Sequence, residues 1–135
     1  MASPEFYYAG FLIPNKLLCE YAKRHGLWRE SSDPNATDEQ ILTFGGRDST
    51  VRVHILNGAG VVPPPADEYH IRARHVRGRN GGPISMIVVG DNKTQQNMKL
   101  APPRRLAKLK LVLGLPEDAK PKWYPAYFQE DRFEE

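Results

Sequence analysis

The sequence predicts a single α+β domain, built on an antiparallel or mixed sheet of about four strands. Residues 85–89 are mostly apolar at successive positions, which is typical of a central strand covered on both faces. Residues 15–25 and 104–113 carry apolar side chains at helical spacing, so we expect two main helices packed on one face of the sheet. The 135 residues suffice for one core, and we predict one domain over 1–135 with frayed ends at 1–5 and 130–135.

The composition places the chain among ordinary globular proteins. Its formal net charge is only +3, which by itself does not imply nucleic acid as a partner. Cys19 is the single cysteine, so no intramolecular disulfide can form, and a reducing compartment is expected. The first residues lack the pattern of a secretory signal, and no apolar run approaches the roughly 18–20 residues of a membrane span. We expect a cytoplasmic or nuclear protein that does not enter a membrane.

The first third of the chain predicts a strand followed by two helices. Residues 6–13 are aromatic and β-branched, which favours a buried strand. The helix over 15–25 is expected to end at Gly26, because glycine is the usual residue past a helix C-terminus. Thr37 followed three residues later by Gln40 fits a capping box, so a short helix is expected to begin there.

A second strand is predicted where apolar and polar residues alternate. Val51, Val53 and Ile55 alternate with Arg52 and His54. Strict alternation over such a run is typical of a half-buried strand with one polar face. We therefore expect residues 51–55 to form a strand whose basic side chains point away from the core.

Residues 70–91 predict a β-hairpin, and the rest of the domain is expected to be organised around it. The first arm alternates, with His70, Arg72 and Arg74 on one face. The turn contains Asn80-Gly81, a dipeptide that tolerates positive φ angles. The second arm is the central apolar strand.

The C-terminal part predicts a helix and an aromatic segment. Residues 104–113 form an amphipathic pattern that ends at Gly114. Residues 123–128 carry several aromatic side chains, which would be costly to leave in water. We expect this segment to dock on the domain or on a second copy of it.

Basic side chains occupy the polar positions of both predicted strands. If these strands are neighbours, their guanidinium and imidazole groups form one cluster that can bind phosphate or carboxylate through charge-assisted hydrogen bonds. We predict a binding face for an anionic ligand, either nucleic acid or a phosphorylated or carboxylated small molecule, with His75 extending the charge towards the hairpin tip. The predicted ligand-binding residues are Arg52, His54, His70, Arg72, Arg74, Arg77 and Arg79.

Other interpretations of the same residues stay open. The basic face can equally be a solvated surface balanced by acidic residues. The chain can also be a small enzyme with His54 or His70 as general acid–base and an arginine that holds the substrate. A third hypothesis is a homodimerising interaction module that uses the aromatic C-terminal segment. The four histidines are dispersed, no spacing indicates a metal site, and no cofactor is predicted.

Overall fold

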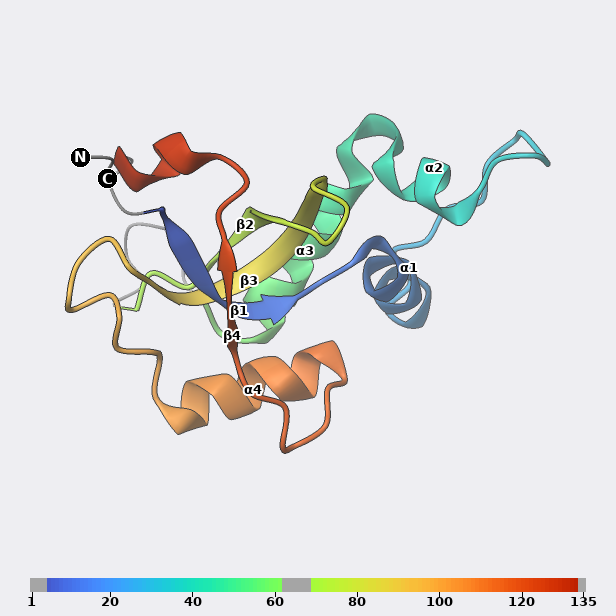
Figure 1. The fold of residues 1–135 in the computed structure, drawn as a ribbon. Helices are drawn as coiled ribbons and strands as arrows, with labels where there is room; N and C mark the ends of the chain where they lie inside the picture. The colour runs from blue at the N-terminus through green and yellow to red at the C-terminus, as the bar shows by residue number, and fades with distance from the viewer. Residues whose placement is uncertain (1–4, 62–68, 134–135) are drawn as a thin grey trace.

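The protein has an α+β fold with a four-stranded antiparallel sheet (Figure 1). The computed structural model describes residues 5–61 and 69–133. The strands lie in the order β2-β3-β1-β4, so the hairpin strands occupy one side of the sheet and the N- and C-terminal strands the other. The strands are β1 (Tyr7–Leu12), β2 (Arg72–Arg77), β3 (Pro83–Asp91) and β4 (Lys122–Pro125).

Four α-helices and two short 3-10 helices accompany the sheet in the described residues. The expected N-terminal and C-terminal helices are both present, and the capping box at Thr37 and Gln40 is formed as predicted. The helices are α1 (Asn15–Arg24), α2 (Asp38–Thr43), α3 (Arg47–Gly58) and α4 (Pro103–Leu113), with η1 (Phe44–Gly46) and η2 (Gln129–Phe133).

The predicted strand over residues 51–55 is wrong, because these residues lie inside helix α3. Val51 and Ile55 are buried at a spacing of four, and Ala59 continues the same face, whereas Val53 is 55% exposed. Alternation over a short run therefore concealed an equally good helical spacing, and packing against the core selected the helix. Arg52 and His54 consequently lie on a helix and not on a strand.

Strand β3 supplies side chains to both faces of the sheet. Ile87 and Val89 belong to a large core cluster, whereas Met86 and Val88 belong to a smaller one. All four side chains are at most 1% exposed. The apolar run predicted as a central strand thus separates two cores.

Strand β1 runs antiparallel to β3 and approaches it closely at a bulge. The register shifts between Ala9 and Gly10. A Cβ atom at Gly10 would lie 1.9 Å from the carbonyl oxygen of Ile87, so only glycine fits at this position.

The large core is formed by the sheet together with helices α1, α2, α3 and α4. Each helix contributes side chains that are almost fully buried, and Phe11 of β1 joins them. The helical members of this core are Leu18, Cys19, Tyr21, Ala22, Leu42, Val51, Ile55, Leu109 and Leu113.

The small core is covered by the C-terminal segment. β4 pairs with β1, and the next residue, Ala126, forms a bridge with Val76 of β2 on the opposite side of the sheet. The backbone N–H of Tyr127 donates to the carbonyl of His75 at 3.0 Å, which fixes this return. The aromatic segment is therefore docked on the domain, although Trp123 and Phe128 keep 42% and 43% of their surface exposed.

We expect truncation of Leu109 to reveal which face of α4 supports the fold. Leu109 is 1% exposed, whereas Leu111, two residues further on, is 81% exposed. Leu109→Ala should lower the free energy of unfolding by about 2–5 kcal/mol, because it removes buried methyl groups and leaves a cavity. Leu111→Ala is the matched control and should change stability by less than about 0.5 kcal/mol in urea denaturation. Equal stabilities of the two variants would contradict the packing of α4.

Candidate functional site

The structure divides the predicted basic face into separate groups. Arg52 lies on α3 and Arg74 on β2, yet both line one cleft. Arg72, on the same strand, lines a different hollow together with His70. His54 lies apart, with its Nδ1 atom 2.7 Å from the hydroxyl of Tyr21. The sequence analysis placed these basic residues on two neighbouring strands, whereas the structure distributes them over a helix, a strand and several hollows.

The α3–β2 cleft is a hollow of about 330 Å³ between α3, the hairpin and the C-terminal segment. Arg52 reaches into it from the helix, and its Nη1 atom lies 3.5 Å from Ser85 Oγ and 3.1 Å from Asp48. Arg52 Nη2 donates to Ser49 at 3.0 Å, so the guanidinium is oriented by contacts on both nitrogens. The residues that line the cleft are Arg52, Ala73, Arg74, His75, Ser85, Phe128 and Asp131.

His75 and Ser85 face each other inside this cleft. They are directly opposed in the antiparallel register of β2 and β3, so their side chains project from the same face of the sheet. Burial lowers the pKa of His75, and the nearby positive charge of Arg52 lowers it further. The imidazole is therefore neutral near pH 7 and can donate or accept a hydrogen bond.

The side chain of Arg74 folds back onto the backbone of its own strand, β2. Its Nη1 atom donates to the carbonyl of Ala73 at 2.9 Å, which satisfies an acceptor that a neighbouring strand would otherwise use. This contact keeps the guanidinium at the mouth of the α3–β2 cleft. Asp131, from η2, also lines this cleft.

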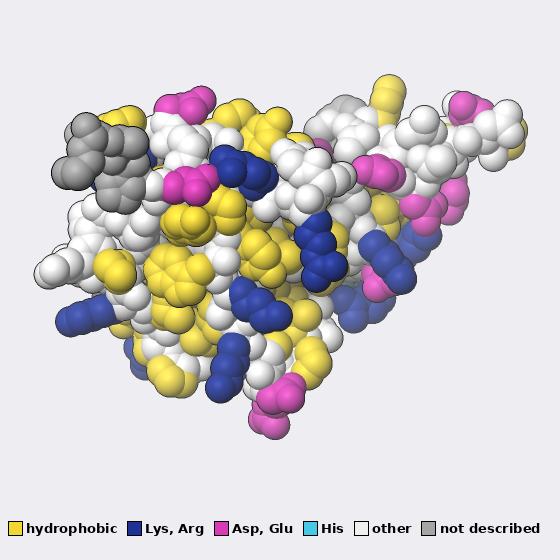
Figure 2. Space-filling model, in the orientation of Figure 1, with side chains coloured by type: hydrophobic (Ala, Val, Ile, Leu, Met, Phe, Trp, Pro, Cys, Tyr) yellow, Lys and Arg dark blue, Asp and Glu magenta, His cyan; other side chains and the backbone are white. Residues whose placement is uncertain are grey.

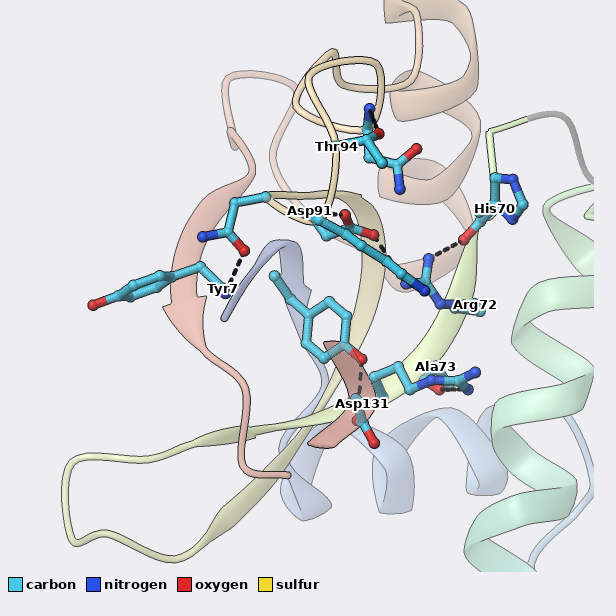
Figure 3. Close-up of polar contacts among 12 residues, drawn as sticks. Tyr7, His70, Arg72, Ala73, Asp91, Thr94 and Asp131 are labelled. Carbon is cyan, nitrogen blue, oxygen red and sulfur yellow. Dashed lines mark hydrogen bonds and ion pairs between the residues drawn. The ribbon is translucent and has the colours of Figure 1, made fainter. Parts of the chain in front are cut away.

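Arg72 forms a buried ion pair with Asp91 at the other end of β2 (Figure 3). The two charged groups are 3.1 Å apart, and their side chains are 16% and 3% exposed. Arg72 Nη1 also donates to the backbone carbonyl of His70 at 2.6 Å, so the carbonyl of His70 and not its ring faces the arginine. Arg72 is therefore held by the protein itself, and its charge is neutralised locally.

Tyr8 lies between Arg72, at the start of β2, and Asp131 of η2. The Arg72 guanidinium lies 5.4 Å from the centre of the Tyr8 ring, and the Tyr8 hydroxyl donates to Asp131 at 3.0 Å (Figure 3). Burial and the negative charge of Asp131 raise the pKa of Tyr8. The tyrosine thus stays protonated and links the ion pair to the α3–β2 cleft.

The two arginines at the hairpin tip lie outside both of these hollows. Arg77 forms an ion pair with Glu5 at 3.0 Å, and both side chains are about two-fifths exposed. Arg77 and Arg79 line a third hollow whose other walls include Leu12, Ile84 and Tyr124. These arginines are therefore placed to add positive potential to the surface.

Sequence reasoning missed the roles of Ser85 and Asp131 and underrated His75. The pairing of His75 with Ser85 follows from the register of the hairpin, which the turn residues alone do not define. The position of Asp131 depends on the return of the C-terminal segment across the sheet. In the described part of the chain, no cluster of three or more histidine, cysteine or acidic side chains is arranged to hold a metal ion.

Comparisons with known proteins provide no assignment. No protein-family model, curated protein or solved structure matches this chain. None of the helices in the described residues combines the length and apolar character required to cross a membrane. The chemistry of the cleft is therefore the basis for a functional proposal.

We expect the Arg72–Asp91 pair to contribute far more to folding than a surface ion pair. Asp91→Ala should lower the free energy of unfolding by about 3 kcal/mol, because it leaves a poorly solvated guanidinium without its counter-charge. The control is Asp38→Ala, which removes the partner of Lys23 in a pair whose side chains are 46% and 58% exposed. That change should cost less than about 1 kcal/mol. Similar losses in the two variants, measured by urea denaturation, would show that Asp91 is not a buried partner.

Proposed function

We propose that the protein binds a phosphorylated or carboxylated small molecule through the α3–β2 cleft. The observation that carries this proposal is the convergence of Arg52 and Arg74, which come from a helix and a strand, on one cleft of about 330 Å³. Two guanidinium groups can hold an anion through forked hydrogen bonds. Ser85 adds a hydroxyl donor and His75 a neutral imidazole.

Acidic residues set the strength of such binding. Asp48 already pairs with Arg52 at 3.1 Å, and Asp131 lies in the wall of the cleft. An incoming anion therefore competes with Asp48 for Arg52 and is repelled by Asp131. We infer a site that selects for ligands with two or three acceptor oxygens, because these can engage both arginines and the serine together.

The size of the cleft favours a small molecule over a nucleic acid. A polynucleotide is held by many phosphate contacts spread along an extended basic surface. Here the arginines are divided among several hollows, and Arg72 and Arg77 are engaged with Asp91 and Glu5. A single compact anionic group suits this arrangement better than a continuous backbone.

An enzymatic function is the second candidate. The specific observation in its favour is the neutral imidazole of His75 directly opposite Ser85, with Arg52 beside the serine. A neutral histidine beside a hydroxyl is the arrangement that general base catalysis uses. The originally expected residues, His54 and His70, do not line this cleft. Turnover of a phosphate ester or carboxylate ester that depends on His75 would support this candidate.

Homodimerisation through the aromatic segment is a further proposal. Figure 2 shows hydrophobic side chains gathered on the face where β4 and α4 lie in Figure 1. Trp123 of β4 is 42% exposed there. Sedimentation of the protein over a range of concentrations would reveal self-association.

Removal of either cleft arginine should weaken anion binding. We expect Arg74→Ala and Arg52→Gln each to reduce the affinity for phenyl phosphate or benzoate by about 1–3 kcal/mol, or roughly 5- to 150-fold, because each removes a charged donor. Arg104→Ala is the matched control, since it removes an exposed arginine of α4 outside the cleft. Binding should also weaken as the salt concentration rises.

Isothermal titration calorimetry of the parent protein and of these variants tests the proposal. Equal affinity of the parent protein and both cleft variants would exclude the cleft as the anion site. Tighter binding of oligonucleotides, with a steep salt dependence, would assign the basic surface to nucleic acid instead.

Acidification should strengthen anion binding through His75. Its folded pKa lies below the ordinary value of 6.5, so the proton is taken up only as the pH falls below 6.5. A bound anion stabilises the imidazolium and raises this pKa, and affinity therefore increases with proton uptake.

In the absence of ligand, the lowered pKa of His75 also makes folding stability depend on pH. The unfolded chain takes up the proton at a higher pH than the folded protein does, so the free energy of unfolding falls as the pH drops through 6.5 towards the folded pKa.

The pKa of His75 can be followed by NMR of the imidazole, assigned with a His75→Gln variant. The expected result is an upward shift when phenyl phosphate is added. An unchanged pKa at saturating ligand would place the anion away from His75.

A further inference from the structure

A hollow of about 710 Å³ lies between the loop of residues 29–36, helix α2 and the first residue of α3, Arg47. Its volume is within the range typical of small-molecule sites. Figure 1 shows that this loop extends beyond α2, away from the sheet. We call the hollow the Arg47 pocket. It shares no lining residue with the α3–β2 cleft, so the two are separate sites.

The guanidinium of Arg47 lines this pocket without a partner. Among the described residues that are at least partly buried, its Nη1 atom is the one buried side-chain nitrogen or oxygen that lacks a hydrogen bond. A buried N–H of a charged group costs free energy when it finds no acceptor. An anion that accepts from this nitrogen removes that cost, which strengthens its binding.

The acidic side chains near Arg47 do not neutralise it. Asp48, the next residue, pairs instead with Arg52 at 3.1 Å. Glu30 and Asp33 line the pocket, but both are exposed, and neither forms an ion pair with Arg47 in the described part of the chain. Each of these two carboxylates accepts a hydrogen bond from a residue two positions away along the chain. The charge of Arg47 is therefore left for a ligand.

Two further side chains of the pocket can donate to an anion. Arg29 and Ser32 both line it from the loop, and neither side chain makes a hydrogen bond within the described residues. Arg29 and Arg47 come from separate elements, so an anion between them can receive hydrogen bonds from two guanidinium groups.

The pocket also has an apolar wall. Phe44 of η1 lines it and is 75% exposed, and its ring contacts no other aromatic or cationic side chain in the described residues. Ile41 and Ala36, both partly buried, lie in the same lining. A free aromatic ring beside aliphatic side chains is suited to packing against the ring of a ligand.

The charges of the lining favour a carboxylate over a phosphate ester. A carboxylate carries one negative charge near pH 7, whereas a phosphate monoester carries about 1.5 to 2. The lining contains two arginines and two acidic residues, Glu30 and Asp33. A second negative charge on the ligand therefore gains little net attraction there, and it must still be taken out of water.

We propose that the Arg47 pocket binds an aromatic monocarboxylate, with the carboxylate on Arg47 and the ring against Phe44. The unpartnered guanidinium and the exposed ring line the same hollow, and each lacks the contact that such a ligand supplies. This proposal does not depend on the function of the α3–β2 cleft.

The test is NMR titration of the ¹⁵N-labelled full-length chain with 3-phenylpropionate. We expect saturable binding, with shifts of the backbone amide signals of Phe44 and Arg47. Arg47→Ala should weaken this binding at least about tenfold, because it removes a charged donor. Phe44→Ala should weaken it about threefold, because it removes the ring contact. In Arg52→Gln, which alters the α3–β2 cleft, binding at these signals should be unchanged.

Matched ligands separate the contributions of charge and ring. The amide 3-phenylpropionamide has the same shape without the charge, and acetate has the charge without the ring. Both should bind more weakly than 3-phenylpropionate. Equal binding of either one would overturn the assigned ligand class, and tighter binding of phenyl phosphate at the same signals would assign the pocket to phosphate esters instead.

Two protein controls lie outside the pocket. Arg104→Ala removes an exposed arginine of α4, and Phe133→Ala removes a ring that is 81% exposed. Both variants should bind 3-phenylpropionate as the parent does. The proposal is overturned if the parent shows no saturable binding, or if Arg47→Ala binds as well as the parent.

Urea denaturation without ligand gives an independent readout. Arg47→Met replaces the guanidinium by an apolar side chain that also fills a long, narrow space. Because the arginine has no partner to lose, this variant should unfold at the same urea concentration as the parent or at a higher one. A lower midpoint would show that the guanidinium has a structural partner in the folded protein and would overturn the proposal.

Discussion

The alternation of apolar side chains along β3 is the constraint on which the rest of the structure depends. Ile87 and Val89 point into the helical core, and Met86 and Val88 point into the small core. A strand that is apolar on both faces must be covered on both, because each face exposed to water would cost hydrophobic stabilisation. The helices cover one set of side chains, and the returning C-terminal segment covers the other.

The return of the C-terminal segment also shapes the α3–β2 cleft. By bridging Val76, Ala126 brings Phe128 and Asp131 to the edge of β2, where they close the α3–β2 cleft. The hydroxyl of Tyr8 donates a hydrogen bond to Asp131, and the guanidinium of Arg72 lies over the Tyr8 ring. Tyr8 therefore contacts both charged side chains. β2 therefore borders two differently charged environments. Arg72, at its start, is paired with Asp91 of β3, and Arg74, two residues further along, lines the cleft together with Arg52 of α3.

The arginines of the two hollows beside β2 differ in how their charges are paired. Arg72 lies 3.1 Å from the buried carboxylate of Asp91, so these two charges offset each other. In the α3–β2 cleft Arg52 and Arg74 come from separate elements, and their acidic neighbours are less buried than Asp91. An anion can compete with a partly exposed carboxylate far more easily than with a buried one.

The sequence alone determined the α+β class, the hairpin, the terminal helices and the capping box at Thr37, because each depends on local spacing and on residues that start or stop an element. It could not decide between strand and helix at residues 51–55, since Val51 and Ile55 satisfy both the strand period and the helix period. Only the tertiary structure brought Arg52 next to Arg74, paired Arg72 with Asp91 and set His75 opposite Ser85. These contacts depend on packing and strand register between distant segments, which no local pattern encodes.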